Sequence, residues 1–213
     1  EGEDIGLRVF VGQRSATISS SNMNPDILAG LVTRAIDMAK EAPEDQYAGL
    51  APQDRLLTGA VPDFDGDDGL DPDPALLRAA ALECENAARA VAGVTNSEGA
   101  GASAGRSIFA LATSHGFAGV KSGSGYGMSA SVLSGDGDAK ERDYDWRTTR
   151  HLADLDSPFN IGTRAGERAV KRLNPGTVKS GQMPVVFDPR VGGSFVGHLL
   201  GGIGGASIAR KTS

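Results

Sequence analysis

A stretch rich in glycine, serine, alanine and β-branched residues runs from Val94 to Arg150, and it constrains the fold more than any other segment. Its apolar residues come in short runs, and glycine-containing breaks fall at residues 115–116, 123–125 and 135–137. Short β-type runs separated by glycine turns are typical of consecutive antiparallel strands. The segment therefore predicts an antiparallel meander of three or four strands.

Shorter elements are predicted on both sides of this meander. Alternating residues around a Gly12-Gln13 turn predict a β-hairpin over residues 5–21. Apolar residues at helical spacing, with a polar cap before a proline in the first two cases, predict helices. The predicted helices cover residues 24–43, 73–93 and 157–173, and a glycine-rich helix follows from Val191. Between the last two of these helices, residues 182–190 predict a short buried strand.

The order of these elements predicts an α+β fold, because strands cluster instead of alternating with helices. The fold is expected to be an antiparallel sheet meander with flanking helices, plus a small N-terminal ββα unit. A broken segment from Glu44 to Asp73 predicts a linker. The expected domains are a partial N-terminal α/β domain (1–64), a central α+β domain (65–180) and the start of a C-terminal domain (181–213). The absence of a starting Met and the abrupt end predict a partial chain.

Composition narrows the functional classes. Lys and Arg number 21 against 27 Asp and Glu, so the net charge of −6 does not favour direct nucleic-acid binding. No run of apolar residues approaches a membrane span, and no signal peptide is visible, so a cytoplasmic protein without membrane contact is expected. Cys84 is the single cysteine, which excludes an intrachain disulfide, and we expect it to be a small core residue.

Three loop motifs suggest ligands but depart from the required patterns. "DFDGDDG", residues 63–69, resembles a calcium loop, but Pro72 stands where an EF-hand needs glutamate. "GSGYG", residues 123–127, lies between β-runs, so a hairpin turn is expected there in place of a phosphate loop. "GGIGG", residues 201–205, lacks the Lys-Ser/Thr pair of a P-loop.

The three histidines, His115, His151 and His198, are far apart in the sequence. No two of them have the i, i+4 spacing that places two imidazoles on one helical face for zinc. A catalytic zinc site usually has three protein ligands and an open position for water. The sequence therefore predicts no metal site, and His198 on an apolar helix is expected to be a packed or capped histidine.

Alternating residues in "KERDYDWRTTR" have two interpretations. The first is a strand with one solvated face and cross-strand charge pairs. The second is a polar surface that lines a groove, in which Tyr144 and Trp146 contact a substrate. No catalytic residue is predicted.

The segments "ALATSHGFAG", "ERDYDW" and "PVVFDPRV…GHLL" closely resemble the TldD/PmbA family, most of all its PmbA (TldE) branch, described as modulator of DNA gyrase. The resemblance covers essentially the whole chain. It implies a metal-dependent peptidase built from a TldD and a TldE subunit, associated with the maturation of peptide antibiotics and the degradation of antitoxins. It also implies a further C-terminal β-rich domain beyond Ser213.

The resemblance also bears on the metal. TldD subunits carry a His-Glu-x-x-x-His zinc helix after the strand that matches "MPVVF". The matching helix here reads "SFVGHLLGGIGG": His198 lies near the first ligand position, Leu199 replaces the glutamate, and residues 201–205 hold no second histidine. The resemblance thus implies a non-catalytic subunit without a cofactor of its own, whose TldD-type partner carries zinc.

Three functions stay open at this point. In the first, the chain joins a TldD-type subunit in a hetero-oligomer and holds an extended peptide on the sheet Arg106 to Arg150. In the second, it is a self-associating regulatory protein linked to DNA gyrase that acts by binding alone. In the third, it is a zinc enzyme whose ligands come from a region outside this sequence.

Overall fold

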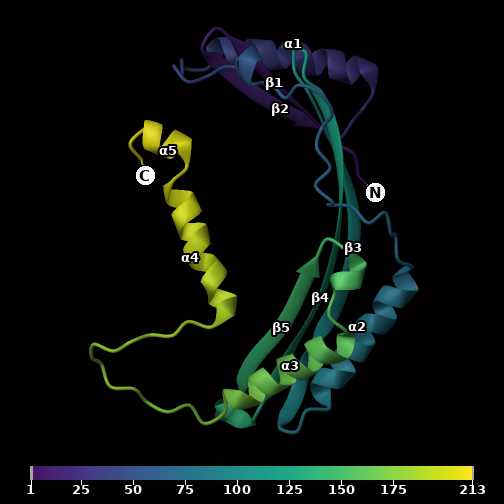
Figure 1. The fold of residues 1–213 in the computed structure, drawn as a ribbon, viewed down its shortest axis with the longest axis vertical. Helices are drawn as coiled ribbons and strands as arrows, with labels where there is room; N and C mark the ends of the chain where they lie inside the picture. Colours follow the sequence, from purple (N-terminus) through teal and green to yellow (C-terminus); the bar gives the residue numbers. More distant parts are fainter. Residues whose placement is uncertain (1, 213) are drawn as a thin grey trace. The chain divides into compact units, whose positions relative to one another are not determined.

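The computed structural model describes residues 2–212, and its chain divides into two compact units (Figure 1). The first unit ends at Leu173 and the second begins at Asn174. The predicted domain boundaries at residues 64/65 and 180/181 stay predictions. Residues 1 and 213, at the outer ends of the first and third predicted domains, lie outside the described residues.

The N-terminal ββα unit forms as predicted. Strands β1 (Ile5–Val11) and β2 (Arg14–Ser20) pair antiparallel around Gly12, whose φ of 61° suits a tight turn. Helix α1 (Pro25–Glu41) packs on both strands. Its N-cap is Asn24, whose side chain accepts the N–H of Asp26 at 2.9 Å. A linker with one short 3-10 turn, η1 (Gln53–Arg55), follows, so the expected break between the two halves of the first unit is present.

The central sheet is an antiparallel meander of three strands in the order β3-β4-β5. Its strands are β3 (Val94–Ala112), β4 (Ala118–Ser134) and β5 (Glu141–Thr149). Short 3-10 turns, η2 (Gly137–Ala139) and η3 (Leu152–Asp154), lie before and after β5. β3 and β4 continue beyond β5, because β5 pairs with β4 only from Tyr126 onward.

The predicted hairpin turn at residues 123–127 is wrong. These residues lie inside β4 and pair across to β3, with Gly125 opposite Gly105 and Gly123 opposite Ser107. The glycines there have no positive φ, and they serve as strand residues without side chains. Glycine was a poor turn signal here because a flat, side-chain-poor strand also uses it.

Two helices cover one face of this sheet (Figure 1). They are α2 (Pro74–Arg89) and α3 (Pro158–Lys171), capped by Asp73 and Ser157. The core between helices and sheet is made of small and medium apolar side chains. Its buried members are Cys84, Ala88, Met128, Ala130, Val132, Ile161, Ala165 and Ala169. Cys84 is the core residue that the sequence predicts, and burial raises the pKa of its thiol to about 11.

The second unit holds α4 (Pro189–Gly202) and α5 (Gly205–Ala209). Asp188 caps α4, and the rings of Phe187 and Phe195 meet edge to face with centroids 4.7 Å apart. The strand predicted over residues 182–190 is wrong: residues 182–188 are irregular, and α4 begins at Pro189. Within this unit no described strand lies beside the segment to satisfy its backbone groups. Nowhere in residues 2–212 is a helix both long enough and apolar enough to span a membrane.

Candidate functional site

A shallow hollow of about 650 Å³ lies on the sheet face opposite α2 and α3. Tyr144 and Trp146 of β5 border it and are 45% and 51% exposed, whereas Asp143 and Asp145 point to the helix side. The floor is formed by small residues of β3 and β4, which are Gly99, Ala100, Gly101, Ser129, Ala130 and Ser131. The two predicted contact residues therefore share one surface. Aromatic side chains beside an almost bare backbone suit contact with an extended chain.

The polar end of the hollow is held by Glu98. This carboxylate accepts a 2.6 Å hydrogen bond from the Ser131 hydroxyl and lies 3.6 Å from an Arg142 nitrogen. The cross-strand charge pair that the first interpretation of this strand expects is thus present beside the aromatic pair. The two interpretations describe the same face of β5.

Asp145 fixes β5 to helix α3 from the opposite side. It is only 5% exposed, accepts from Nε of Arg164 at 2.6 Å and also pairs with Arg168. Arg164 reaches Asp156 as well, at 2.5 Å. The hydrogen bond to Asp145 raises the pKa of the Arg164 guanidinium. This buried, multiply bonded carboxylate holds β5, and hence the positions of Tyr144 and Trp146, against the helix.

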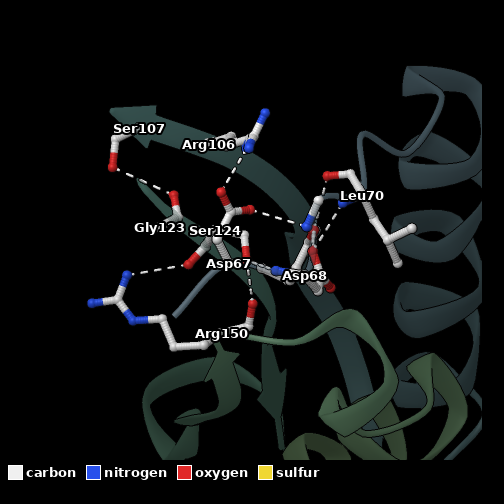
Figure 2. Close-up of polar contacts among 10 residues, drawn as sticks. Asp67, Asp68, Leu70, Arg106, Ser107, Gly123, Ser124 and Arg150 are labelled. Atoms are coloured by element: carbon white, nitrogen blue, oxygen red, sulfur yellow. Dashed lines mark hydrogen bonds and ion pairs between the residues drawn. The ribbon is translucent and has the colours of Figure 1, made fainter. Parts of the chain in front are cut away.

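A second hollow, of about 870 Å³, lies where the segment 61–69 crosses the far part of β3 and β4. Four aspartates belong to that segment. Figure 2 shows Asp67 beside the guanidinium of Arg106, at 2.8 Å from Nε. His151 donates through Nε2 to the Asp65 carbonyl at 2.8 Å, and this bond raises the pKa of His151. The strongest attachments, however, belong to Asp68.

Asp68 ties the segment 66–70 to β4 and to the turn after β5. Its carboxylate accepts from the Tyr126 hydroxyl at 2.5 Å, from the Leu152 N–H at 2.8 Å and from the Leu70 N–H at 3.0 Å. Burial raises its pKa, but these hydrogen bonds outweigh burial and lower the pKa to about 2. Asp68 therefore holds this segment in place through its ionised carboxylate, and we call these hydrogen bonds the Asp68 clamp.

Ser124 completes the attachment from β4. Its hydroxyl donates to the Arg150 carbonyl at 2.6 Å and accepts the Asp68 N–H at 3.1 Å. Its own N–H donates to the Gly66 carbonyl at 2.8 Å (Figure 2). The serine is 1% exposed, so these bonds are shielded from water. Sequence reasoning missed this site, and only the density of aspartates in "DFDGDDG" marked the segment.

Acid titration tests the clamp. Because the pKa of Asp68 is lower in the folded chain than the ordinary 3.8, its contribution to stability is present above that value and is lost as the pH falls toward 2. We expect Asp68→Asn to lower the free energy of unfolding at neutral pH and to reduce its fall between about pH 4 and 2. Urea unfolding at several pH values, with the exposed Asp138→Asn as control, measures the difference. Parallel pH profiles of wild type and Asp68→Asn would contradict the assignment.

The histidines and acidic residues do not converge on a metal. His198 lies on α4 of the second unit and is exposed, with Leu199 and Leu200 following it. His115 contacts the Ala51 carbonyl through Nδ1 at 3.1 Å. Within residues 2–212 no three His, Cys, Asp or Glu side chains are grouped as a metal site, so the residues present do not fit a zinc centre. Residues 63–69 likewise do not fit a calcium site, because the carboxylates of Asp67 and Asp68 accept hydrogen bonds from donors of the protein itself.

The central sheet and its two helices belong to a known class of domain. Residues 67–173 match the family model described as the PmbA/TldA metallopeptidase central domain. This range begins at Asp67, within the segment that Asp68 attaches to β4, and ends with the last residue of the first unit. The chain belongs to the PmbA/TldD metallopeptidase family and is a PmbA homologue.

Curated relatives agree with this assignment. The chain is 31% identical over 210 residues to the Haemophilus influenzae protein "Metalloprotease PmbA homolog" and 30% identical over 211 residues to "Metalloprotease PmbA" of Escherichia coli O157:H7. In both cases the match covers 98% of this chain and 46% of the relative. The chain thus spans about half the length of the curated relatives it matches.

Solved structures share the fold. A Bacteroides thetaiotaomicron protein described as a candidate modulator of DNA gyrase superposes with a TM-score of 0.85 at 24% identity, over 98% of this chain and 48% of that one. TldE from Thermococcus kodakarensis gives a TM-score of 0.62 at 18% identity, over 79% of this chain and 37% of that one. At these identities the likeness concerns the fold alone.

Proposed function

We propose that this chain is the non-catalytic, PmbA/TldE-type subunit of a metal-dependent peptidase, and that it holds extended peptides for a TldD-type subunit that carries the zinc. The observation that carries the proposal is the sequence of α4. His198 is followed by Leu199 where the zinc helix of TldD subunits has glutamate, and no second histidine follows in the helix. One imidazole cannot hold a hydrolytic zinc ion.

The sheet surface supports the peptide-holding part of this proposal. Tyr144 and Trp146 border a floor of glycine, alanine and serine, which lets another backbone approach closely. Stacking on the two rings would add affinity without selecting one sequence. Such a surface fits a subunit that presents varied small peptides or unfolded segments to a partner. The chemistry of cleavage would come from that partner.

A regulatory protein linked to DNA gyrase is the second candidate. It is favoured by the solved structures with this fold that are described as candidate modulators of DNA gyrase. In that case the exposed rings and the sheet would bind a protein and no peptide would be cleaved. The net charge of −6 argues against direct contact with DNA under either function.

Affinity capture distinguishes the two candidates. The full-length protein, tagged and expressed in its own host, is expected to retain a TldD-type subunit in near-equal amount, and this complex is expected to survive moderate salt. A Trp146→Ala variant tests whether the sheet face serves peptide binding, because it should raise KM for a peptide while leaving the captured partner in place. Capture of gyrase without a TldD-type subunit would contradict the proposal.

A further inference from the structure

Residues 61–70, which we call the strap, lie along β4 beyond the part of that strand that pairs with β5. At the outer end, a Cβ added to Gly119 would lie 2.9 Å from a methyl group of Val61. Further along, the carbonyl of Gly66 accepts the N–H of Ser124 at 2.8 Å. The strap thus covers a strand edge that would otherwise present unpaired backbone groups. It also forms one wall of the second hollow.

Two attachments hold the strap, and they respond to different ranges of pH. The Asp68 clamp holds the inner end, and the pKa of Asp68 at about 2 keeps its carboxylate ionised at neutral pH. The second attachment is the hydrogen bond from Nε2 of His151 to the Asp65 carbonyl, at 2.8 Å. Asp65 has a φ of 51°, a left-handed conformation that few residues other than glycine adopt. The histidine therefore holds the strap at the point where its backbone conformation is least favourable.

Three carboxylates act on the imidazole of His151. An oxygen of the Asp65 carboxylate lies 3.5 Å from Nε2, and the charges of Asp154 and Asp68 also act on the ring. The adjacent Arg150 donates instead to a carbonyl of β4 at 3.1 Å (Figure 2). The hydrogen bond to the Asp65 carbonyl raises the pKa of His151 above its ordinary 6.5, and the negative charges add to this effect although burial opposes it. The closed strap therefore stabilises the protonated ring.

We infer that His151 is a pH-sensitive switch: its imidazolium form holds residues 61–66 on β4, and its neutral form lets them detach while the Asp68 clamp stays closed. The neutral ring keeps at most its hydrogen bond and loses the attraction of the carboxylates. Because the closed strap raises the pKa of His151, the additional attachment is complete below pH 6.5 and is lost as the pH rises through the raised pKa. Detachment widens the second hollow and exposes the N–H of Ser124. The inference goes beyond the proposed function, because it requires no partner, peptide or metal.

Hydrogen exchange of the full-length protein tests the switch. Exchange at pH 6 and pH 8 is measured by mass spectrometry, with labelling times scaled for the faster chemical exchange at pH 8. Peptides that cover residues 61–66 and Ser124 report on the strap, because Gly66 protects the Ser124 N–H. Their protection is expected to fall about threefold from pH 6 to pH 8, as for the loss of an exposed ion pair, whereas α2 keeps its protection.

Two variants assign the effect to His151. His151→Gln keeps an N–H donor but has no titrating ring, so its strap is expected to have equal protection at both pH values. His115→Gln is the matched control, because His115 contacts a backbone carbonyl outside the strap, that of Ala51, at 3.1 Å. This control should retain the change seen in wild type. Circular dichroism melts verify that both variants are folded.

Asp65→Asn tests the charge separately. Asparagine keeps the backbone carbonyl that accepts from His151 and tolerates the left-handed conformation, but it lacks the carboxylate. Exchange of the imidazole C2–H, followed by mass spectrometry, gives the pKa of His151 in wild type and in this variant. A lower pKa is expected in Asp65→Asn, because one of the charges that favour the imidazolium is removed.

The outcomes separate this inference from the proposed function. Equal protection of the strap at pH 6 and pH 8 in wild type, or the full change in folded His151→Gln, overturns the switch even if a TldD-type partner is captured. A change that His151→Gln abolishes and His115→Gln retains supports the switch even if no such partner is captured. If His151→Gln fails to fold, an unchanged pKa of His151 in Asp65→Asn overturns the switch, and a lowered one supports it.

Discussion

Replacing Gly162 by alanine is expected to destabilise the first unit by about 3 kcal/mol or more. Gly162 lies on the side of α3 that faces α2, and a Cβ there would stand 2.0 Å from the Cys84 carbonyl oxygen and 3.0 Å from the Ala88 nitrogen. These obstacles are backbone atoms of a neighbouring helix, which cannot rotate aside. The two helices would have to separate, and the core around Cys84 would lose its packing.

A matched glycine provides the control. Gly30 lies within α1, and a Cβ added there would meet nothing within 4 Å. Gly30→Ala is therefore expected to be neutral or to stabilise by up to about 1 kcal/mol, because alanine favours the helix. Urea unfolding followed by circular dichroism measures both variants. Equal stability of Gly162→Ala and wild type would show that α2 and α3 are not in this close contact.

The meander itself could be predicted from sequence, because alternation and glycine breaks describe local geometry. The breaks at residues 115–116 and 135–137 are turns in the structure, with positive φ at Gly116, Gly135 and Gly137. The break at residues 123–125 is not, since glycine there keeps one sheet face bare. A sequence pattern cannot distinguish a glycine that bends the chain from one that flattens it. The strand predicted at residues 182–190 was wrong for a different reason, because no described strand of the second unit lies beside this segment to pair with it.

The candidate site was predictable only in part. Alternation in β5 placed Tyr144 and Trp146 on one face of the strand, and in the structure both residues line the same hollow. The clamp was not predictable, because Asp68 and the Tyr126 hydroxyl are 58 residues apart and meet only after the sheet forms. No local periodicity records such a contact. The role of both rings in binding a substrate stays a prediction.

The second prediction with a large expected effect concerns the peptidase activity of the protein. The full-length protein purified alone is expected to show no peptidase activity and no stoichiometric zinc, and activity is expected to appear when a TldD-type subunit is added. The reason is the ligand set: His198 is a single imidazole, and the residues after it, Leu199 and Leu200, cannot coordinate metal or act as a general base. A His198→Ala variant should therefore leave the activity and zinc content of the complex unchanged.

Zinc content is the measurement that tests the central claim most directly. Elemental analysis of the isolated full-length protein and of its complex, each gel-filtered in the presence of trace zinc, gives the metal bound per chain. Zinc that is far below stoichiometric in the isolated protein and stoichiometric with the TldD-type subunit in the complex is the predicted result. Stoichiometric zinc on the isolated protein that is lost in His198→Ala, together with cleavage of a peptide by that protein alone, would contradict the account.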